Sequence, residues 1–270
     1  MANLKSQKLN QSRKTNSERN SKVYKYDALT YGVIDENENV AITNYGENIP
    51  VNNENITFAS ATDVGTSTWN DVFFDIADIY EDYSMVDANN VEIYTMEESF
   101  IEEETDHYAC LVTALAICAD YYGALDYSNF SEDYLDLWDL SDTSTSSTSN
   151  GIIYGASPIQ AAGAVLVDFC EAKNVYITSQ YLTNPSINSF RTCIRRGDVG
   201  IIHLGINRQE STGIEESRHS MAVEGYAIIR KNNTTSNVNT VLVADGWYAE
   251  PRYLNFDFDD YTVKRAHVFN

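Results

Sequence analysis

The chain has 270 residues, 43% of them hydrophobic, so it can form one large domain or two small ones around a sizeable core. Forty acidic residues oppose eighteen basic ones, which gives a formal net charge of −22 and a pI near 4.3. This acidic balance argues against a nucleic-acid partner, whose phosphates need Lys and Arg, and against binding to an anionic membrane surface.

The N-terminal part predicts neither a membrane anchor nor an export signal. No run of about 18 apolar residues exists, so no membrane insertion is expected. Residues 1–22 are polar and basic and lack the apolar middle of a signal peptide. The chain is therefore expected to be cytoplasmic or to be secreted by another route. We interpret residues 1–65 as a disordered tail and possible pro-segment, with strand-like pieces at residues 23–26 and 41–43.

The clearest helix is predicted over residues 109–122. Leu111, Leu115, Cys118 and Tyr122 recur at helical spacing on one face, and Gly123 supplies a stop. Cys110 lies at the front of this helix. An N-terminal helix position favours a thiolate, because free N–H groups and the helix dipole stabilise an anion there.

After this helix the pattern changes from helical to alternating. Residues 141–150 are a low-complexity Ser/Thr stretch and predict an exposed loop or interdomain link. Ser157-Pro158 predicts the start of a helix that runs to about residue 173, and a second, short helix follows over residues 184–197. Strands are then expected at residues 199–206, 220–230, 240–244, 252–258 and 261–269. Helices followed by antiparallel strands predict an α+β domain over residues 66–270, with a helical lobe at about 100–197 and a β lobe at about 198–270.

Three residues have the types and order of a thiol nucleophile system. Cys110 would attack, His219 would act as base at the leading end of a strand, and Asp245 on the next strand would fix the imidazole. Each also has a structural interpretation: a core cysteine, a core or surface histidine, and a turn residue before Gly246. His203, in an apolar strand, is interpreted as a core residue.

The cysteine pattern predicts no metal or cofactor. None of the four cysteines forms a CxxC pair, so a zinc site is not expected. For Cys118, Cys170 and Cys193, buried apolar thiols are favoured over a disulfide.

Together these residues resemble the papain-like cysteine peptidases, in particular the bacterial branches of streptopain and the double-glycine leader peptidases. Residues 219–226, His-Ser-Met-Ala-Val-Glu-Gly-Tyr, are similar to the family's His-Ala-x-Ala-x-x-Gly-Tyr strand. Residues 110–116, Cys-Leu-Val-Thr-Ala-Leu-Ala, resemble the nucleophile helix, and residues 243–247, Val-Ala-Asp-Gly-Trp, fill the third position. The resemblance covers roughly residues 100–260. It implies a papain-like two-lobed fold, a nucleophile helix packed against an antiparallel sheet, and a peptide or protein substrate.

The chain departs from that family at the oxyanion position. The family usually has Gln about six residues before the nucleophile, where this chain has Glu104. A protonated Glu104, His107 or a main-chain N–H would have to stabilise the oxyanion. The sequence thus predicts a hydrolase that cleaves peptide, isopeptide or amide bonds. The alternative is a non-catalytic binding or surface protein on a papain-like scaffold. The sequence does not specify the substrate or the oligomeric state.

Overall fold

The computed structural model describes residues 76–210 and 213–270, together with Trp69, residues 72–74 and four short strands between Lys22 and Val51. The chain divides into two compact units, Met1–Ser67 and Thr68–Asn270. We describe each unit by itself.

The first unit contains one antiparallel sheet. Its strands pair in chain order, and they are β1 (Lys22–Lys25), β2 (Tyr31–Ile34), β3 (Asn39–Ile42) and β4 (Asn48–Val51). The strand-like residues 23–26 and 41–43 overlap β1 and β3. The rest of residues 1–65 lies outside the described residues, so the disordered tail and the pro-segment stay predictions.

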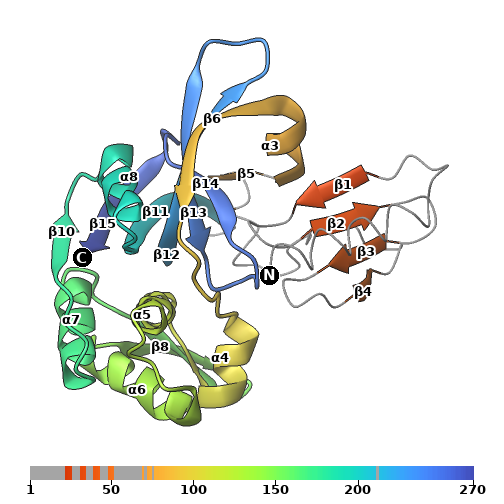
Figure 1. Cartoon of the computed structure of the whole chain (residues 1–270). Helices are drawn as coiled ribbons and strands as arrows, with labels where there is room; N and C mark the ends of the chain where they lie inside the picture. Colours follow the sequence, from red (N-terminus) through yellow and green to blue (C-terminus); the bar gives the residue numbers. More distant parts are fainter. Residues whose placement is uncertain are drawn as a thin grey trace. The chain divides into compact units, whose positions relative to one another are not determined.

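The second unit is built on an eight-stranded antiparallel sheet (Figure 1). Its order is β10-β15-β11-β12-β13-β14-β5, and β6 pairs with the far part of the long strand β12. The strands are β5 (Phe73–Phe74), β6 (Tyr83–Asn90), β10 (Ser179–Leu182), β11 (Gly200–Glu210), β12 (Gly213–Lys231), β13 (Asn237–Ala244), β14 (Arg252–Asn255) and β15 (Tyr261–Phe269). The predicted C-terminal strands correspond to β11 to β15.

Helices and a small second sheet complete this unit, which confirms the predicted α+β class. The helices are α3 (Ile76–Asp82), α4 (Glu98–Thr105), α5 (Cys110–Tyr121), η2 (Tyr127–Asn129), α6 (Phe130–Leu140), α7 (Ala162–Ala172) and α8 (Ile187–Arg195). Figure 1 shows α4 to α7 gathered on one side of the large sheet. No helix in the described part of the chain is long and apolar enough to cross a membrane.

Helix α5 lies at the centre of one hydrophobic cluster. Every residue from Leu111 to Ala119 is buried, because α4, α6, α7 and the sheet surround the helix. A helix that is apolar all round is expected to be buried in this way. A second cluster, which includes Trp69, Leu204 and Met221, covers the other face of the sheet. Strand β12 therefore separates two cores, and every residue from His219 to Ala227 is buried.

Three sequence predictions were wrong in detail. Residues 144–149 of the predicted loop form strand β8 (Ser144–Ser149), which pairs with β9 (Ile152–Ala156); β9 in turn pairs with β7 (His107–Tyr108). All β8 residues are exposed, so no apolar burial marks the strand in the sequence; main-chain pairing with β9 and a hydrogen bond from the Ser146 hydroxyl to the Tyr154 main-chain oxygen at 2.9 Å hold it. Helix α7 begins at Ala162, because the Ser157 hydroxyl bonds to the hydroxyl of Thr143 at 2.6 Å instead of capping a helix. Helix α8 is capped by Ser186 and ends at Arg195.

Gly200 shows how closely the sheet strands pack, and it generates a prediction. A methyl group at this position would lie 2.8 Å from the main-chain oxygen of His267 on β15. We expect Gly200→Ala to lower the free energy of unfolding by about 1–3 kcal/mol, since the main chain must move. Urea unfolding measures this change. The control Ser147→Ala, on the exposed strand β8, should change it by less than about 0.5 kcal/mol. Equal effects of the two variants would contradict the close approach.

Candidate active site

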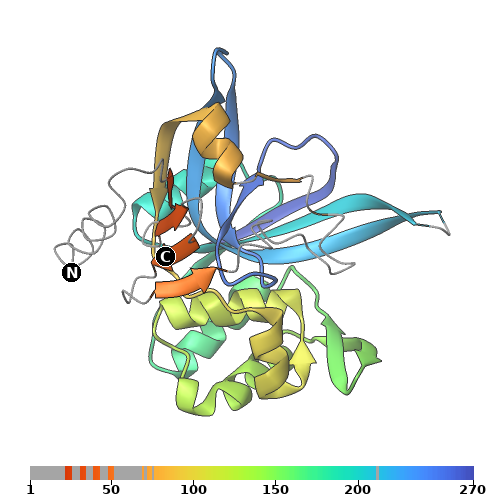
Figure 2. The ribbon, with the colours of Figure 1, turned by 90° about the vertical axis from the view of Figure 1, so that its right-hand side faces the viewer.

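A cavity of about 490 Å³ contains two of the predicted site residues, Cys110 and His219. Its walls come from the start of α5, the end of β9 and the loop that follows it, and strands β10, β11, β12 and β15. Figure 2 shows the β8–β9 hairpin and the long β11–β12 hairpin extending toward the same side of the unit. The fold thus brings together a thiol and an imidazole that lie more than a hundred residues apart in the sequence.

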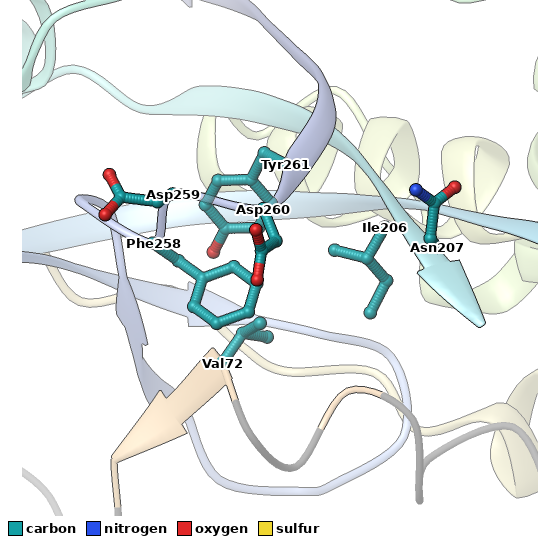
Figure 3. Close-up of a pocket in the computed structure, with 7 residues that line it drawn as sticks. All are labelled: Val72, Ile206, Asn207, Phe258, Asp259, Asp260 and Tyr261. Atoms are coloured by element: carbon teal, nitrogen blue, oxygen red, sulfur yellow. The ribbon is translucent and has the colours of Figure 1, made fainter. Parts of the chain in front are cut away.

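A second cavity, of about 520 Å³, has a different character (Figure 3). Its lining residues are Val72, Ile206, Asn207, Phe258, Asp259, Asp260 and Tyr261. None of these described residues offers a thiol or an imidazole, whereas Cys110 and His219 both line the first cavity.

The position of Cys110 is fixed by the start of α5 and by Tyr134 on α6. Ala109 holds the N-cap position but has no side chain that can cap. Its N–H instead donates to the Tyr134 hydroxyl at 3.1 Å, and Thr113 Oγ1 lies 3.2 Å from the same hydroxyl. Tyr134 is fully buried, so this anchor is rigid. The first N–H groups of α5 remain available to an anion.

Of the four cysteines, Cys110 alone is partly exposed; the other three are buried, and all four are free thiols. Burial of the surroundings raises the pKa of the Cys110 thiol, and hydrogen bonds from Ser220 and from the Leu111 main chain act in the opposite direction. The resting form at neutral pH is therefore a protonated thiol.

His219 is held in one orientation. Its Nε2 lies 2.7 Å from the main-chain oxygen of Asp245. The Trp247 ring stacks on the imidazole with centroids 3.9 Å apart and planes 2° from parallel, and the Trp69 ring lies at 5.7 Å. A carbonyl oxygen can only accept, so Nε2 carries the proton of the neutral ring and Nδ1 has the lone pair. Burial lowers the pKa of His219 to about 4, which keeps the ring neutral.

Asp245 reaches His219 through its main chain, whereas the sequence predicted a fixing carboxylate. Its carboxylate accepts from the N–H groups of Trp247 at 2.9 Å and Tyr248 at 3.1 Å, and from Arg252 Nη1 at 3.0 Å. The Arg252 guanidinium lies 3.7 Å from the centre of the Phe73 ring and 4.6 Å from that of Tyr248. Burial raises the pKa of the Asp245 carboxyl, and Arg252 opposes that rise. The carboxylate thus holds the turn that presents the main-chain oxygen.

The two side chains considered for the oxyanion lie elsewhere. Glu104 is exposed in the last turn of α4. The Nδ1 of His107 lies 2.6 Å from the Thr105 main-chain oxygen, and its ring packs against Trp138. Neither residue lines the cavity of Cys110. Of the three candidates, the main-chain N–H groups at the start of α5 lie beside the sulfur.

Sequence reasoning missed several groups around the site. Trp69 precedes His219 by 150 positions, yet its indole N–H bonds to Ser217 Oγ at 3.1 Å and its ring packs beside the imidazole. Arg252 was noted only as the start of a strand. His203 was interpreted as core and is buried, but it also lines the cavity. Only the arrangement of the strands reveals these contacts. Within the described residues no three metal-ligating side chains cluster.

Comparisons with known proteins give weak likenesses. No protein-family model and no curated protein matches the sequence. Among solved structures, the chain is similar to a "putative C39-like peptidase from Bacillus anthracis", with a TM-score of 0.34, 12% identity, and coverage of 59% of this chain and 87% of that one. It is also similar to two variants of the Salmonella effector SpvD, with TM-scores of 0.26 and 0.24, 10% identity, and coverage of 78% of this chain and 94% of theirs. Likenesses at these scores do not establish a family for this chain.

The pairing of Asp245 with Arg252 generates a prediction. Arg252→Met leaves a buried carboxylate without its cation, so we expect the free energy of unfolding to fall by roughly 3 kcal/mol. The double variant Arg252→Met/Asp245→Asn should recover most of this loss, because no unpaired charge remains. Denaturant unfolding at neutral pH measures both. The control Arg230→Met, on an exposed arginine, should have little effect. A loss in Arg252→Met no larger than the control's would contradict the role of the pair.

Proposed function

We propose that this chain is a cysteine peptidase-like thiol hydrolase that cleaves peptide, isopeptide or related amide bonds. Cys110 is the nucleophile, His219 is the general base and Asp245 is the third member. The observation that carries the proposal is that Cys110 and His219 line one cavity while Asp245 fixes the proton of His219 on Nε2. The basic nitrogen Nδ1 is then the one available to a thiol.

In this proposal the resting pair is neutral. Burial raises the pKa of Cys110 and lowers that of His219, so thiol and imidazole coexist at neutral pH. As the sulfur attacks a carbonyl carbon, the thiol proton passes to Nδ1 of His219. The resulting imidazolium returns that proton to the leaving amine, and water then releases the acyl group from sulfur. The N–H groups at the start of α5 supply hydrogen bonds for the oxyanion.

The surroundings of His219 suit this cycle. Trp69 and Trp247 exclude water from the imidazole, and a low-dielectric site strengthens each hydrogen bond. The nucleophile comes from the helical group and the base from the sheet, which is the papain-like division into two lobes that we propose for this unit. No step requires a metal or an organic cofactor.

The alternative is a non-catalytic binding protein on the same scaffold. The raised pKa of the Cys110 thiol favours it, because a protonated thiol is a weak nucleophile. The two functions differ in whether substrate induces proton transfer from Cys110 to His219, which turnover measures directly.

A peptide library digested by the purified chain tests the proposal. We expect Cys110→Ala to abolish cleavage and His219→Ala to lower kcat/KM by roughly 10²- to 10⁴-fold, because general-base catalysis contributes that much. The matched control Cys118→Ala removes a buried thiol of the same helix and should retain cleavage. Intact folding of each variant is checked by circular dichroism. Cleavage that survives in Cys110→Ala, or no cleavage by the unsubstituted chain, would favour the binding protein.

The charge of the cavity predicts a substrate preference. Arg218 and Arg265 line it, and none of its described lining residues is Asp or Glu, although the chain carries 40 acidic residues against 18 basic ones. A substrate with an acidic side chain near the scissile bond should therefore be cleaved roughly fivefold better than its Lys counterpart. Arg265→Gln should reduce this ratio, whereas Arg230→Gln, outside the cavity, should not. Equal rates for acidic and basic peptides would contradict the prediction.

A further inference from the structure

The face of the large sheet that lines the cavity of Cys110 carries cationic side chains around one buried histidine. Strands β12, β11 and β15 pair in register, and Ser220, His203 and Arg265 occupy one row across them. Directly paired residues of neighbouring strands share a face, with Cβ atoms about 5 Å apart. All three residues line the cavity. His203 therefore lies between a hydroxyl on one side and a guanidinium on the other.

The next row along the strands adds a second arginine and leaves room above the sheet. It consists of Arg218, Gly205 and Val263, and the two residues that flank the glycine line the cavity. Gly205 has no side chain, and a glycine inside a strand often marks the close approach of a ligand. Because alternate residues of a strand share a face, Arg218 is a diagonal neighbour of His203. Both strands that neighbour β11 thus place an arginine beside His203.

The imidazole of His203 has one paired and one unpaired nitrogen. Its Nδ1 lies 2.9 Å from the Ser220 hydroxyl. Its Nε2 is buried and has no hydrogen-bond partner among the described residues. His203 is only 2% exposed, and an unpaired polar atom at such a position costs free energy. A ligand in the cavity that bonds to Nε2 would remove this cost.

The groups around the cavity favour an anionic ligand. Burial lowers the pKa of His203 to about 3, so at neutral pH the ring is neutral and carries one proton. The Ser220 hydroxyl can rotate to donate to Nδ1, which leaves the ring proton on Nε2 as a donor. Arg265 donates through Nη1 to the Lys264 main-chain oxygen at 2.8 Å, which uses one of its five N–H donors. No Asp or Glu is among the described residues that line the cavity.

A carboxylate matches this set of donors. It only accepts hydrogen bonds, and its two oxygens can accept from an imidazole N–H and a guanidinium at once. A positive group in the same place would meet two arginines and no acid. A neutral amide would leave the two positive charges without a partner.

We propose that His203, Arg265 and Arg218 form a subsite that binds a carboxylate group of a peptide ligand, with Nε2–H of His203 as its buried donor. Ser220 is a positioning residue, because its hydroxyl fixes the ring proton on Nε2. The inference rests on the proposed function for the peptide nature of the ligand, but binding does not require cleavage. The carboxylate can come from an Asp or Glu side chain or from a free C-terminus, since both present the same chemistry.

The test titrates the full chain, carrying isotope-labelled histidine, with three small compounds at constant ionic strength. N-acetylglutamate α-amide has a side-chain carboxylate, N-acetylglycine has a terminal one, and N-acetylglutamine α-amide has none. The chain has four histidines, so single variants assign each ring signal. We expect at least one carboxylate to shift the His203 signals, with the proton on Nε2, and to bind roughly tenfold more tightly than the glutamine compound. Which carboxylate binds identifies its source.

Protection of Cys110 locates the bound compound. Because Cys110 lines the same cavity, a bound carboxylate should slow its alkylation by iodoacetamide, measured by mass spectrometry of the Cys110 peptide. The glutamine compound at the same concentration should not slow it.

Substitutions separate the donors from the fold. Arg265 is only partly buried, and we expect Arg265→Gln to weaken carboxylate binding roughly fivefold without changing that of the glutamine compound. His203→Leu should act in the same way, and His203→Gln, which can place an amide N–H near Nε2, should restore part of the loss. Arg265→Gln decides the test if the His203 variants do not fold.

Two matched controls should leave carboxylate binding unchanged. Arg230→Gln replaces an exposed arginine of β12 that does not line the cavity. His267→Asn replaces a buried histidine of β15 that lies on the same face, but whose Nε2 bonds to the Ile159 main-chain oxygen at 2.9 Å.

The inference is overturned by equal binding of the carboxylates and the glutamine compound, by binding that does not protect Cys110, or by a ring proton on Nδ1 of His203 in the complex. Equal losses in Arg265→Gln and Arg230→Gln overturn it too. Peptide cleavage without carboxylate binding would remove only the subsite. Carboxylate binding without peptide cleavage would overturn only the proposed function.

Discussion

The bond between His219 Nε2 and the main-chain oxygen of Asp245 is the interaction on which the site depends. It determines which imidazole nitrogen carries the proton, and therefore which one can take a proton from a thiol. A main-chain oxygen cannot rotate like a side chain, so the turn that holds it must be rigid. The Asp245 carboxylate provides this rigidity by binding the following N–H groups and Arg252.

The same turn explains why Gly follows Asp245. Gly246 has φ of +80°, and a methyl group there would lie 2.8 Å from the Tyr108 hydroxyl. The main-chain oxygen of Gly246 also accepts from the first N–H of α4 at 2.7 Å, so the turn is attached to the helical group. The Asp-Gly pair thus has both interpretations that the sequence left open. It is a turn, and through that turn it fixes the histidine.

The sequence predicted much of this arrangement because periodicity reports burial. The apolar spacing after Cys110 placed the start of α5 within a residue, and the alternating pattern after Gly197 located β11 to β15. The sequence could not show that Asp245 contacts His219 through its main-chain oxygen. A contact through the carboxylate would require the same residue at the same end of the strand. Arg252 and Ser220 were equally hidden: the contacts of Arg252 come from a turn, and those of Ser220 from the register of β11 against β12. Strand β8 escaped prediction because exposed Ser and Thr give no burial pattern.

Strand β12 carries His219 on one face and Ser220 on the other. A buried thiol resists ionisation, and a buried imidazole resists protonation, so the proton transfer that we propose between them would create two charges in a site that disfavours both. His219, on one face, is oriented by a dipole that favours the imidazolium, because a carbonyl oxygen stabilises the protonated ring. Ser220, on the other face, places its hydroxyl 2.9 Å from Nδ1 of the buried His203. A one-residue shift of β12 against β11 would exchange their faces, so the chemistry that we propose for the cavity depends on the register of this strand pair.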